Sequence, residues 1–183
     1  MNLIYSDLHK FFEYGLKLKS TKRSGWISKV GVNDPESVAD HSYSTCLISM
    51  VLSDLIGLKT EKVLKMTILH DLAESIIGDY MPDEIDKKSK HDLEQNAMKL
   101  ILQSVPASVR TEYHKIWEEY SQNITRTANF VHSVDKLDLA MQAKEYETEY
   151  PKHLLAQFIR TSRKVLKSKN KFPILLEILN TLK

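Results

Sequence analysis

The chain has 183 residues, of which 42% are hydrophobic and 27% charged, a composition typical of globular proteins that excludes global disorder. The net charge is only +2, which argues against nucleic acid or a membrane surface as an obligate partner. The single cysteine, Cys46, excludes an intrachain disulfide and a zinc site built from several thiolates. This length suits one domain spanning residues 1–183.

The sequence carries no predicted membrane or export segment. No apolar run approaches the ~20 residues that a membrane-spanning helix needs. Asp7, Lys10 and Glu13 interrupt the apolar residues near the N-terminus, where a signal peptide would be continuously apolar. We therefore expect a cytoplasmic protein. Cys46 lies in an apolar run, where a small buried side chain is expected rather than a nucleophile.

Apolar residues recur at helical spacing from the first predicted element onward. That first helix carries Leu3, Leu8, Phe11, Phe12 and Leu16. The segment Lys17–Pro35 then reads as a long connection, because Gly25, Gly31, Asn33 and Pro35 interrupt any helix. Long connections of this kind in a compact domain are often functional.

Two further helices are predicted before the centre of the chain. One runs from about Pro35 to Gly57, and its apolar residues are expected to be buried: Cys46, Leu47, Met50, Val51 and Leu55. The next begins at Thr60, which is expected to act as its N-cap, and continues into the stretch 70–79.

The second half of the chain is also predicted to be helical. After a polar loop at 78–90, helices are expected over 91–104, 106–122, 124–150, 151–167 and 172–182. Pro106, Pro151 and Pro173 each fall near a first helical turn, where a missing backbone N–H costs least. The predicted fold class is therefore all-α, a single helical bundle.

The stretch His70–Asp79 contains one imidazole and three carboxylates in ten residues. If it is helical, Glu74 lies one turn from both His70 and Asp71. His70 and Asp71 would diverge by about 100° around the helix, so they meet at one point only through something between them, such as a divalent cation. The alternative is a solvated acidic face with a histidine at the end of a helix.

Two other ionisable residues fit a metal site with this stretch. His41 lies near the start of a predicted helix, and Asp135 lies within an apolar pattern where an unpaired charge would be costly. Asp135 either forms a salt bridge, for example with Lys136, or completes a metal site. The four ligands of that site would be His41, His70, Asp71 and Asp135. Two imidazoles and two carboxylates suit Mn, Co, Fe, Ni or Mg.

His41, the His70-Asp71 pair and Asp135 follow one another in the order H…HD…D, which resembles that of the HD-domain metal-dependent phosphohydrolases. Four longer segments contain these residues or lie near them: LKSTKRSGW at 18–26, PESVADH at 35–41, HDLAESIIGD at 70–79 and FVHSVDKLDLAMQAKEYE at 130–147. These segments give a closer resemblance, from about residue 16 to 150, to the 5′-deoxynucleotidases of the YfbR-like and HD domain-containing protein 2 group. Asp40 departs from the pattern, since many relatives have glutamate there.

The resemblance implies a role for each matching residue. The metal ligands would be His41, His70, Asp71 and Asp135. Glu74 would act on the attacking water or the leaving group, and its alternative role is to orient His70.

The substrate-binding residues implied by the resemblance are Arg23, Trp26 and Asp79. Arg23 belongs to a loop that meets the phosphate, and arginine can grip a phosphate through two hydrogen bonds. Trp26 could stack on a base or simply close the site, and the alternative is that it anchors the long connection in the core. Asp79 either lies beside the sugar or only shapes the loop around Pro82.

The implied reaction is hydrolysis of nucleoside 5′-monophosphates, preferentially deoxyribonucleotides, to nucleoside and phosphate. One alternative is another nucleotide phosphohydrolase or phosphodiesterase on the same metal scaffold, and another is a non-catalytic nucleotide-binding protein. The resemblance also suggests a homodimer. The run Arg160–Lys171 has six basic residues and no acidic one, and a solvated face is its expected role, with weak nucleic-acid contact as the alternative.

Overall fold

A computed structural model describes residues 2–81, 83–169 and 171–182. Within these ranges the regular secondary structure consists of helices, and an isolated antiparallel bridge joins Lys22 to Ser37. The helices are α1 (Asn2–Leu18), α2 (Ser24–Val30), α3 (Val38–Leu55), α4 (Thr60–Leu69), α5 (Glu74–Ile77), α6 (Lys87–Gln103), α7 (Ala107–Gln122), α8 (Arg126–Tyr146), α9 (Lys152–Lys169) and α10 (Pro173–Thr181). The all-α prediction is confirmed. Within the described ranges, no helix is both long and apolar enough to cross a membrane.

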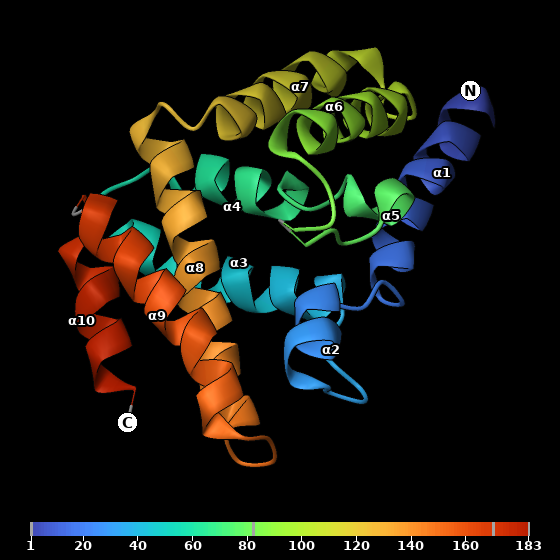
Figure 1. Ribbon diagram of the computed structural model, residues 1–183. Helices are drawn as coiled ribbons and strands as arrows, with labels where there is room; N and C mark the ends of the chain where they lie inside the picture. The colour runs from blue at the N-terminus through green and yellow to red at the C-terminus, as the bar shows by residue number, and fades with distance from the viewer. Residues whose placement is uncertain (1, 82, 170, 183) are drawn as a thin grey trace.

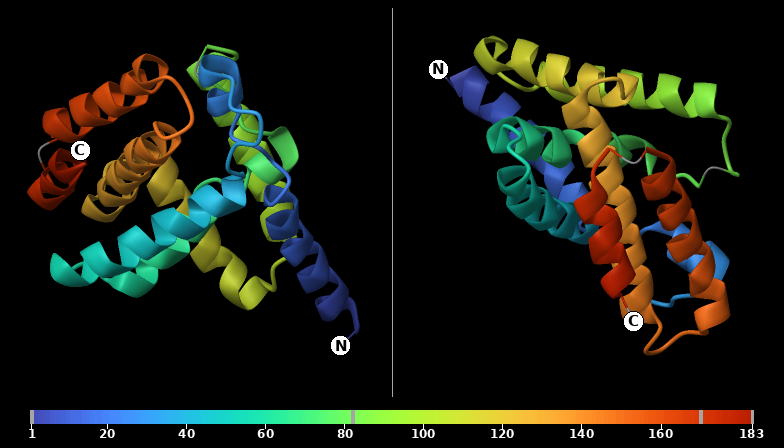
Figure 2. Two further views of the ribbon diagram at one scale, coloured as in Figure 1. Left: turned by 90° about the horizontal axis from the view of Figure 1, so that it is seen from below. Right: turned by 90° about the vertical axis from the view of Figure 1, so that its left-hand side faces the viewer.

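Helix α8 is the centre of the arrangement. It packs against α3, α4 and α7 on one side and against α9 and α10 on the other (Figure 1). Helices α6 and α7 lie side by side across one end of the molecule, and α2 packs against α9 (Figure 2). Residues contributed by α3, the end of α4 and α8 therefore meet in the interior.

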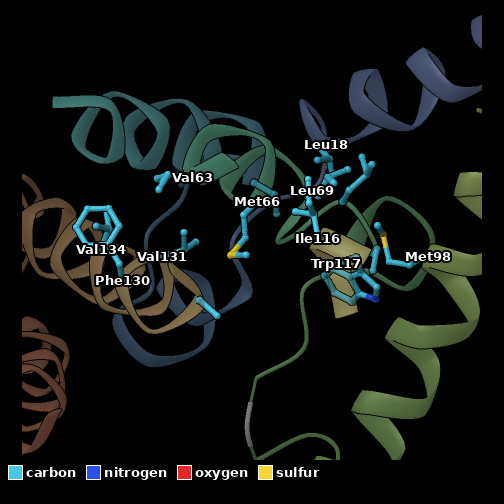
Figure 3. Close-up of a cluster of buried hydrophobic side chains, with 14 of the residues drawn as sticks. Leu18, Val63, Met66, Leu69, Met98, Ile116, Trp117, Phe130, Val131 and Val134 are labelled. Carbon is cyan, nitrogen blue, oxygen red and sulfur yellow. The ribbon is translucent and has the colours of Figure 1, made fainter. Parts of the chain in front are cut away.

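The main core lies where α4, α7 and α8 meet (Figure 3). Met66 of α4 and Val131 of α8 are fully buried there, and Trp117 of α7 is 2% exposed. Thr125 caps the start of α8 by accepting a hydrogen bond from the backbone N–H of Ala128 at 3.1 Å. The burial of α8 on several sides holds its polar residues at fixed positions.

The connection predicted at Lys17–Pro35 contains a helix, so this part of the prediction is wrong. Helix α1 extends to Leu18, and α2 occupies seven residues of the supposed loop. An isolated helix of this length is unstable in water, so tertiary packing has to hold it. Trp26 and Val30 supply that packing because both are buried against residues of α8 and α9.

The buried face of α3 is the opposite of the predicted one. Its buried stripe consists mainly of small or polar residues: Val38, His41, Thr45, Ser49, Leu52 and Ser53. The apolar residues that we expected inside are partly or largely exposed, with Leu47 50% and Leu55 67% exposed. Thr67 Oγ1 of α4 donates to Ser49 Oγ at 3.3 Å. Small side chains let α3 and α4 approach closely, and apolar periodicity alone does not reveal this packing.

We call the outward apolar residues of α3 the α3 apolar stripe: Tyr43, Leu47, Met50, Val51 and Leu55. Cys46 is only half-buried beside the stripe, and burial raises the pKa of its thiol to about 11. A thiol with this pKa is a poor nucleophile at neutral pH, as the sequence indicated.

The predicted start of α4 is also wrong in detail. Thr60 is the first helical residue, and the N-cap position is Lys59, which makes no capping hydrogen bond with its side chain. The Thr60 hydroxyl instead donates to Asp54 at the end of α3. Thr60 therefore joins two helices rather than capping one.

Candidate metal centre

His41 is placed by a capping box at the start of α3. Ser37 Oγ accepts from the backbone N–H of Asp40, and Asp40 Oδ2 accepts from the backbone N–H of Ser37 at 2.8 Å. This fixes the first turn, in which His41 is fully buried. His41 Nδ1 donates to Asp138 Oδ2 at 2.6 Å, and Ser44 Oγ donates to the other oxygen of Asp138 at 2.5 Å. These bonds orient the ring so that Nε2 faces the site.

His70 comes from a turn rather than from a continuous helix. Helix α4 ends at Leu69 and α5 begins at Glu74, so the predicted helical run through this stretch is interrupted. His70 Nδ1 donates to the backbone carbonyl of Thr67 at 2.5 Å. His70 Nε2 lies 3.3 Å from His41 Nε2. In both rings Nδ1 donates its proton to another group, so each Nε2 has a free lone pair. Two such nitrogens at this distance need a proton or a cation between them.

Two carboxylates approach the same point. Asp71 Oδ2 lies 3.1 Å from His70 Nε2 and 3.5 Å from His41 Nε2. Asp135 Oδ1 lies 3.5 Å from His41 Nε2, while its Oδ2 lies 2.9 Å from Lys136 Nζ. The structure thus brings together all four candidate ligands, and Asp135 also makes the salt bridge that the sequence offered as the alternative.

Charge pairing within this cluster outweighs burial. Burial alone would raise the pKa of Asp71, but His70, His41 and Arg23 lower it well below its usual range. The pKa of Asp135 is lowered mainly by Lys136 and His41, again against burial. Burial would lower the pKa of His70, and the charge of Asp71 reverses this and raises it. A cluster of this composition, with ligand atoms of His41, His70 and Asp71 within 4.8 Å of one another, fits a divalent cation.

Arg23 reaches the cluster because the chain before α2 pairs with the start of α3. The backbone N–H of Arg23 donates to Glu36 O at 3.1 Å, and that of Val38 donates to Thr21 O at 2.8 Å. Arg23 Nη1 then lies 3.5 Å from Asp71 Oδ2, and its Nε lies 4.0 Å from Glu36 Oε1. Burial opposes its charge, but Asp71, Asp79 and other carboxylates raise its pKa, so the guanidinium stays charged.

Glu74 is a buried carboxyl group at the edge of the cluster. It is 5% exposed, and its Oε2 atom has no hydrogen-bond partner among the described residues. Burial and the charges of Asp71 and Asp79 raise its pKa well above the usual range. A buried polar atom without a protein partner is costly, so this oxygen indicates a position for water or a ligand.

Trp26 is a core residue that also borders the cavity described below. It is 1% exposed, its Nε1 donates to Glu36 Oε1 at 2.8 Å, and its ring packs edge-on against Tyr146 with centroids 5.2 Å apart. Its ring centroid lies 4.5 Å from that of Phe158. This environment favours the anchoring role for Trp26, and stacking on a base stays a prediction.

Asp79 ties the loop after α5 to α2. Gly78 has φ = +82°, a conformation that side chains disfavour, and it turns the chain back toward α2. Asp79 Oδ2 accepts from the backbone N–H of Ser24 at 2.7 Å, at the first residue of α2. The loop after α5 and helix α2 also lie close together beyond Asp79, since a Cβ at Gly25 would lie 2.9 Å from Met81 Sδ. Asp79 thus caps α2, a contact that the sequence did not reveal.

The site opens into a cavity of about 550 Å³. Residues from six helices and three connecting segments line it, among them Arg23, Asp71, Glu74, Asp79, Asp135 and Lys136. One wall is formed by Tyr120, whose ring stacks on His132 at 4.1 Å between centroids and meets His70 edge-on at 5.8 Å. A cavity of this size accepts a small metabolite such as a nucleotide.

The sequence did not reveal the residues that hold the proposed ligands and the substrate-binding side chains in place. Asp138 holds His41, and Glu36 holds both Trp26 and Arg23. The carboxylates of Glu36 and Asp138 also lie close enough to His41 to resemble a second metal cluster. Because His41 Nδ1 donates to Asp138, we interpret that group as support for the ring. The spacing of Asp138 three residues after Asp135 was the available signal, since it puts both on one face of α8.

Metal binding should release protons and strengthen as the pH rises. The raised pKa of His70 means that the metal-free imidazole keeps its proton to a higher pH than usual, and a cation must displace it. Affinity should therefore increase with pH up to that raised pKa and level off above it. Isothermal titration calorimetry in buffers of different ionisation enthalpy measures the released protons. An affinity that is constant with pH, without proton release, would contradict this expectation.

The class of protein is defined by a helical fold that brings two histidines and two aspartates together beside a polar cavity. The HD domain model matches residues 16–172, and the chain belongs to this family. Among relatives, the chain is 39% identical over 142 residues to a human protein named 5′-deoxynucleotidase HDDC2, covering 77% of this chain and 69% of the relative. It is also 39% identical over 152 residues to the Dictyostelium discoideum protein of that name, covering 79% and 80%.

Solved structures agree with the family. A conserved hypothetical protein from Pyrococcus furiosus superposes with a TM-score of 0.74 at 35% identity, covering 94% of this chain and 98% of that one. The PH0347 protein from Pyrococcus horikoshii superposes with a TM-score of 0.76 at 32% identity and the same coverage. The helical arrangement around the site is therefore shared with these proteins.

Proposed function

We propose that this protein is a metal-dependent 5′-deoxynucleotidase that hydrolyses nucleoside 5′-monophosphates to nucleoside and phosphate. The observation that carries this proposal is the convergence of His41, His70, Asp71 and Asp135 beside a buried, unpartnered oxygen of Glu74. Relatives at 38–39% identity that bear the name 5′-deoxynucleotidase support the same substrate class.

The four converging residues would hold the metal ion, with Mn, Co, Ni, Fe and Mg as candidates. Bound there, the ion would supply positive charge for the phosphate and lower the pKa of water. Asp138 and the Thr67 carbonyl keep the Nδ1 protons of His41 and His70 away from the ion. The chemistry of this donor set suits a borderline or hard divalent ion.

The remaining side chains would bind the substrate and move the proton. Arg23 would donate to phosphate oxygens from the wall of the cavity, held in place by Asp71 and Glu36. Glu74 would take the proton of the attacking water or give one to the leaving 5′-oxygen. Its raised pKa suits this role, because a general acid–base group works best with a pKa near the working pH.

Asp79 should contribute to the preference for deoxyribonucleotides. Placed by α2 beside the cavity, its carboxylate would exclude a 2′-hydroxyl by shape and position. In Asp79→Ala, the ratio of kcat/KM for matched deoxy- and ribonucleotides should shrink, mainly because the ribonucleotide improves. Asp79→Asn keeps the size and the capping oxygen and should stay near the wild-type ratio. If both substrates fall by one factor in Asp79→Ala, Asp79 acts only through α2.

A homodimer formed through the α3 apolar stripe is our proposal for the assembly. Exposed apolar side chains that are contiguous on one helix face are typical of protein interfaces, and Tyr43 and Leu55 are 73% and 67% exposed. Leu47→Lys should shift the protein toward the monomer, because a charge would be buried in the interface. Sedimentation velocity measures this shift, with Leu93→Lys on α6 as the control. A wild-type monomer at all concentrations would contradict the proposal.

Our expectations about nucleic acid as a partner and about the cellular location rest on the sequence composition. Arg160, Lys164 and Lys167 are exposed on α9, as expected of a solvated basic face, and we expect no nucleic-acid partner. A cytoplasmic location and a single domain stay predictions.

The function is tested by measuring phosphate release from a panel of mono-, tri- and cyclic nucleotides, with the metal-free protein reloaded with each candidate ion. We expect deoxynucleoside monophosphates to be the best substrates, no activity after chelation, and recovery with Mn²⁺ or Co²⁺. Preference for triphosphates or cyclic nucleotides would favour the second enzyme class. Nucleotide binding without turnover under all conditions would favour a non-catalytic binding protein.

A further inference from the structure

Lys136 lies in the candidate site next to one of the proposed ligands. Its ammonium nitrogen is 2.9 Å from Asp135 Oδ2, while Asp135 Oδ1 faces His41 Nε2 at 3.5 Å. The side chain is 35% exposed and lines the same cavity as Arg23. Each of the two cations therefore contacts a different carboxylate of the cluster, Arg23 at Asp71 and Lys136 at Asp135.

The other lysines that line the cavity, among the residues that the structure describes, have partners away from the cluster. Lys29 Nζ lies 2.5 Å from Asp83 Oδ2. Lys90 Nζ donates to the carbonyl of Tyr80 at 3.2 Å and lies 3.7 Å from Glu94 Oε1. Both contacts hold the walls of the cavity. Lys136 is thus the lysine whose charge is directed at the metal position.

The charge balance of the site indicates what Lys136 can bind. A divalent ion bound by Asp71 and Asp135 has its charge balanced by the two carboxylates, so a phosphate monoester with two negative charges still needs positive partners. Arg23 supplies one positive charge. Once Asp135 shares its charge with the ion, Lys136 loses most of its present counter-charge and can bind an anion.

We infer that Lys136 is a second phosphate-binding residue, contacting the phosphate from the Asp135 side of the site while Arg23 contacts it from the Asp71 side. This inference rests on the proposed function, because it assigns the phosphate of that substrate to the cavity. The competing explanation is that Lys136 only orients Asp135, in which case its loss would weaken metal binding rather than phosphate binding.

The test compares Lys136→Gln with wild type by isothermal titration calorimetry, using Mn²⁺-loaded protein and inorganic phosphate. Glutamine can still donate an N–H to Asp135, so this variant removes the charge and keeps an anchor for the carboxylate. The Kd for phosphate should rise by roughly tenfold or more, as expected for a lost hydrogen bond to a charged group. Metal content and the Kd for an uncharged deoxynucleoside should stay the same, and the affinity for Mn²⁺ should not fall, because the variant removes a positive charge beside the ion.

Two further variants complete the test. Lys136→Arg keeps the charge and should bind phosphate within about threefold of wild type, well short of the tenfold loss expected when the charge is removed. Lys144→Met removes a lysine from the same helix, where it pairs with Glu147 outside the cavity, and should change nothing measured here. A matching melting temperature for each variant shows that the fold is kept, and Lys136→Met replaces the glutamine variant if that one fails to fold.

Three outcomes would overturn the inference: no phosphate binding by the wild type, an unchanged phosphate Kd in both uncharged variants, or loss of Mn²⁺ that accounts for the weaker phosphate binding. The last outcome would make Lys136 a positioning residue for Asp135. Because the measurement uses phosphate and not turnover, it stands apart from the proposed function. A protein that binds phosphate through Lys136 but hydrolyses no nucleotide would overturn only the proposed function.

Discussion

Asp71→Asn should empty the site of metal and abolish hydrolysis together. The carboxylate lies 3.1 Å and 3.5 Å from the two ring nitrogens of the site, so its loss removes a negative ligand from the centre of the cluster. An amide of the same shape should be accepted by the fold. Changes around metal ligands typically cost 10–100-fold in affinity or activity for the supporting residues alone, and we expect a loss of at least roughly 10²-fold for a ligand. Elemental analysis and phosphate release measure the two quantities.

The control for this substitution is Asp92→Asn, an exposed aspartate on α6 that should leave metal content and rate unchanged. Normal metal content in Asp71→Asn would mean that Asp71 is not a ligand. In that case its ion pair with Arg23, at 3.5 Å, would be its main role.

Glu74→Gln should keep the metal and lose the rate. Because Glu74 is proposed to hold or move the proton of the attacking water, the amide should slow hydrolysis by about 10²–10⁴-fold. The substitution also removes a buried ionisable group, so the variant should be no less stable than wild type near neutral pH. Kinetics with saturating substrate and metal, together with elemental analysis, distinguish the two effects. Glu118→Gln, at an exposed position on α7, is the matched control.

The pH dependence of the hydrolysis rate tests the role of Glu74 independently. The wild-type rate should follow a titration above the usual range of a carboxyl group, because the pKa of Glu74 is raised by burial and by its charged neighbours. This titration should disappear in Glu74→Gln. Loss of metal from the variant would instead identify Glu74 as a ligand.

The four candidate ligands could be predicted because their types and spacing carry the chemistry. His41, His70, Asp71 and Asp135 come from three separate parts of the chain, and the structure brings them within reach of one point. The helical class was equally accessible, since apolar periodicity is a local property. Local patterns could not show which carboxylates support the rings, because Asp138 and Glu36 act through contacts across 97 and 10 residues of sequence.

The orientation of α3 shows a second limit of sequence patterns. An apolar stripe normally marks the buried face of a helix. Here Thr45, Ser49 and Ser53 are buried while Leu47 and Val51 are about half exposed. The buried face has to admit His41 to the site and α4 at short range, so small polar residues occupy it. Likewise α2 is too short to be detected by periodicity and depends on Trp26 for its position.

The attachment of the loop after α5 to α2 couples the substrate-binding residues to one another. Asp79 bonds to Ser24 and Lys29 pairs with Asp83, so Asp79 and the start of α2 move together. Arg23, directly before α2, also contacts Asp71, a proposed metal ligand in the turn between α4 and α5. Any displacement of α2 would therefore shift the contacts to the phosphate and to the sugar together, and would reach the ion through Asp71. Substrate affinity, sugar selectivity and metal affinity should therefore change together when α2 is altered.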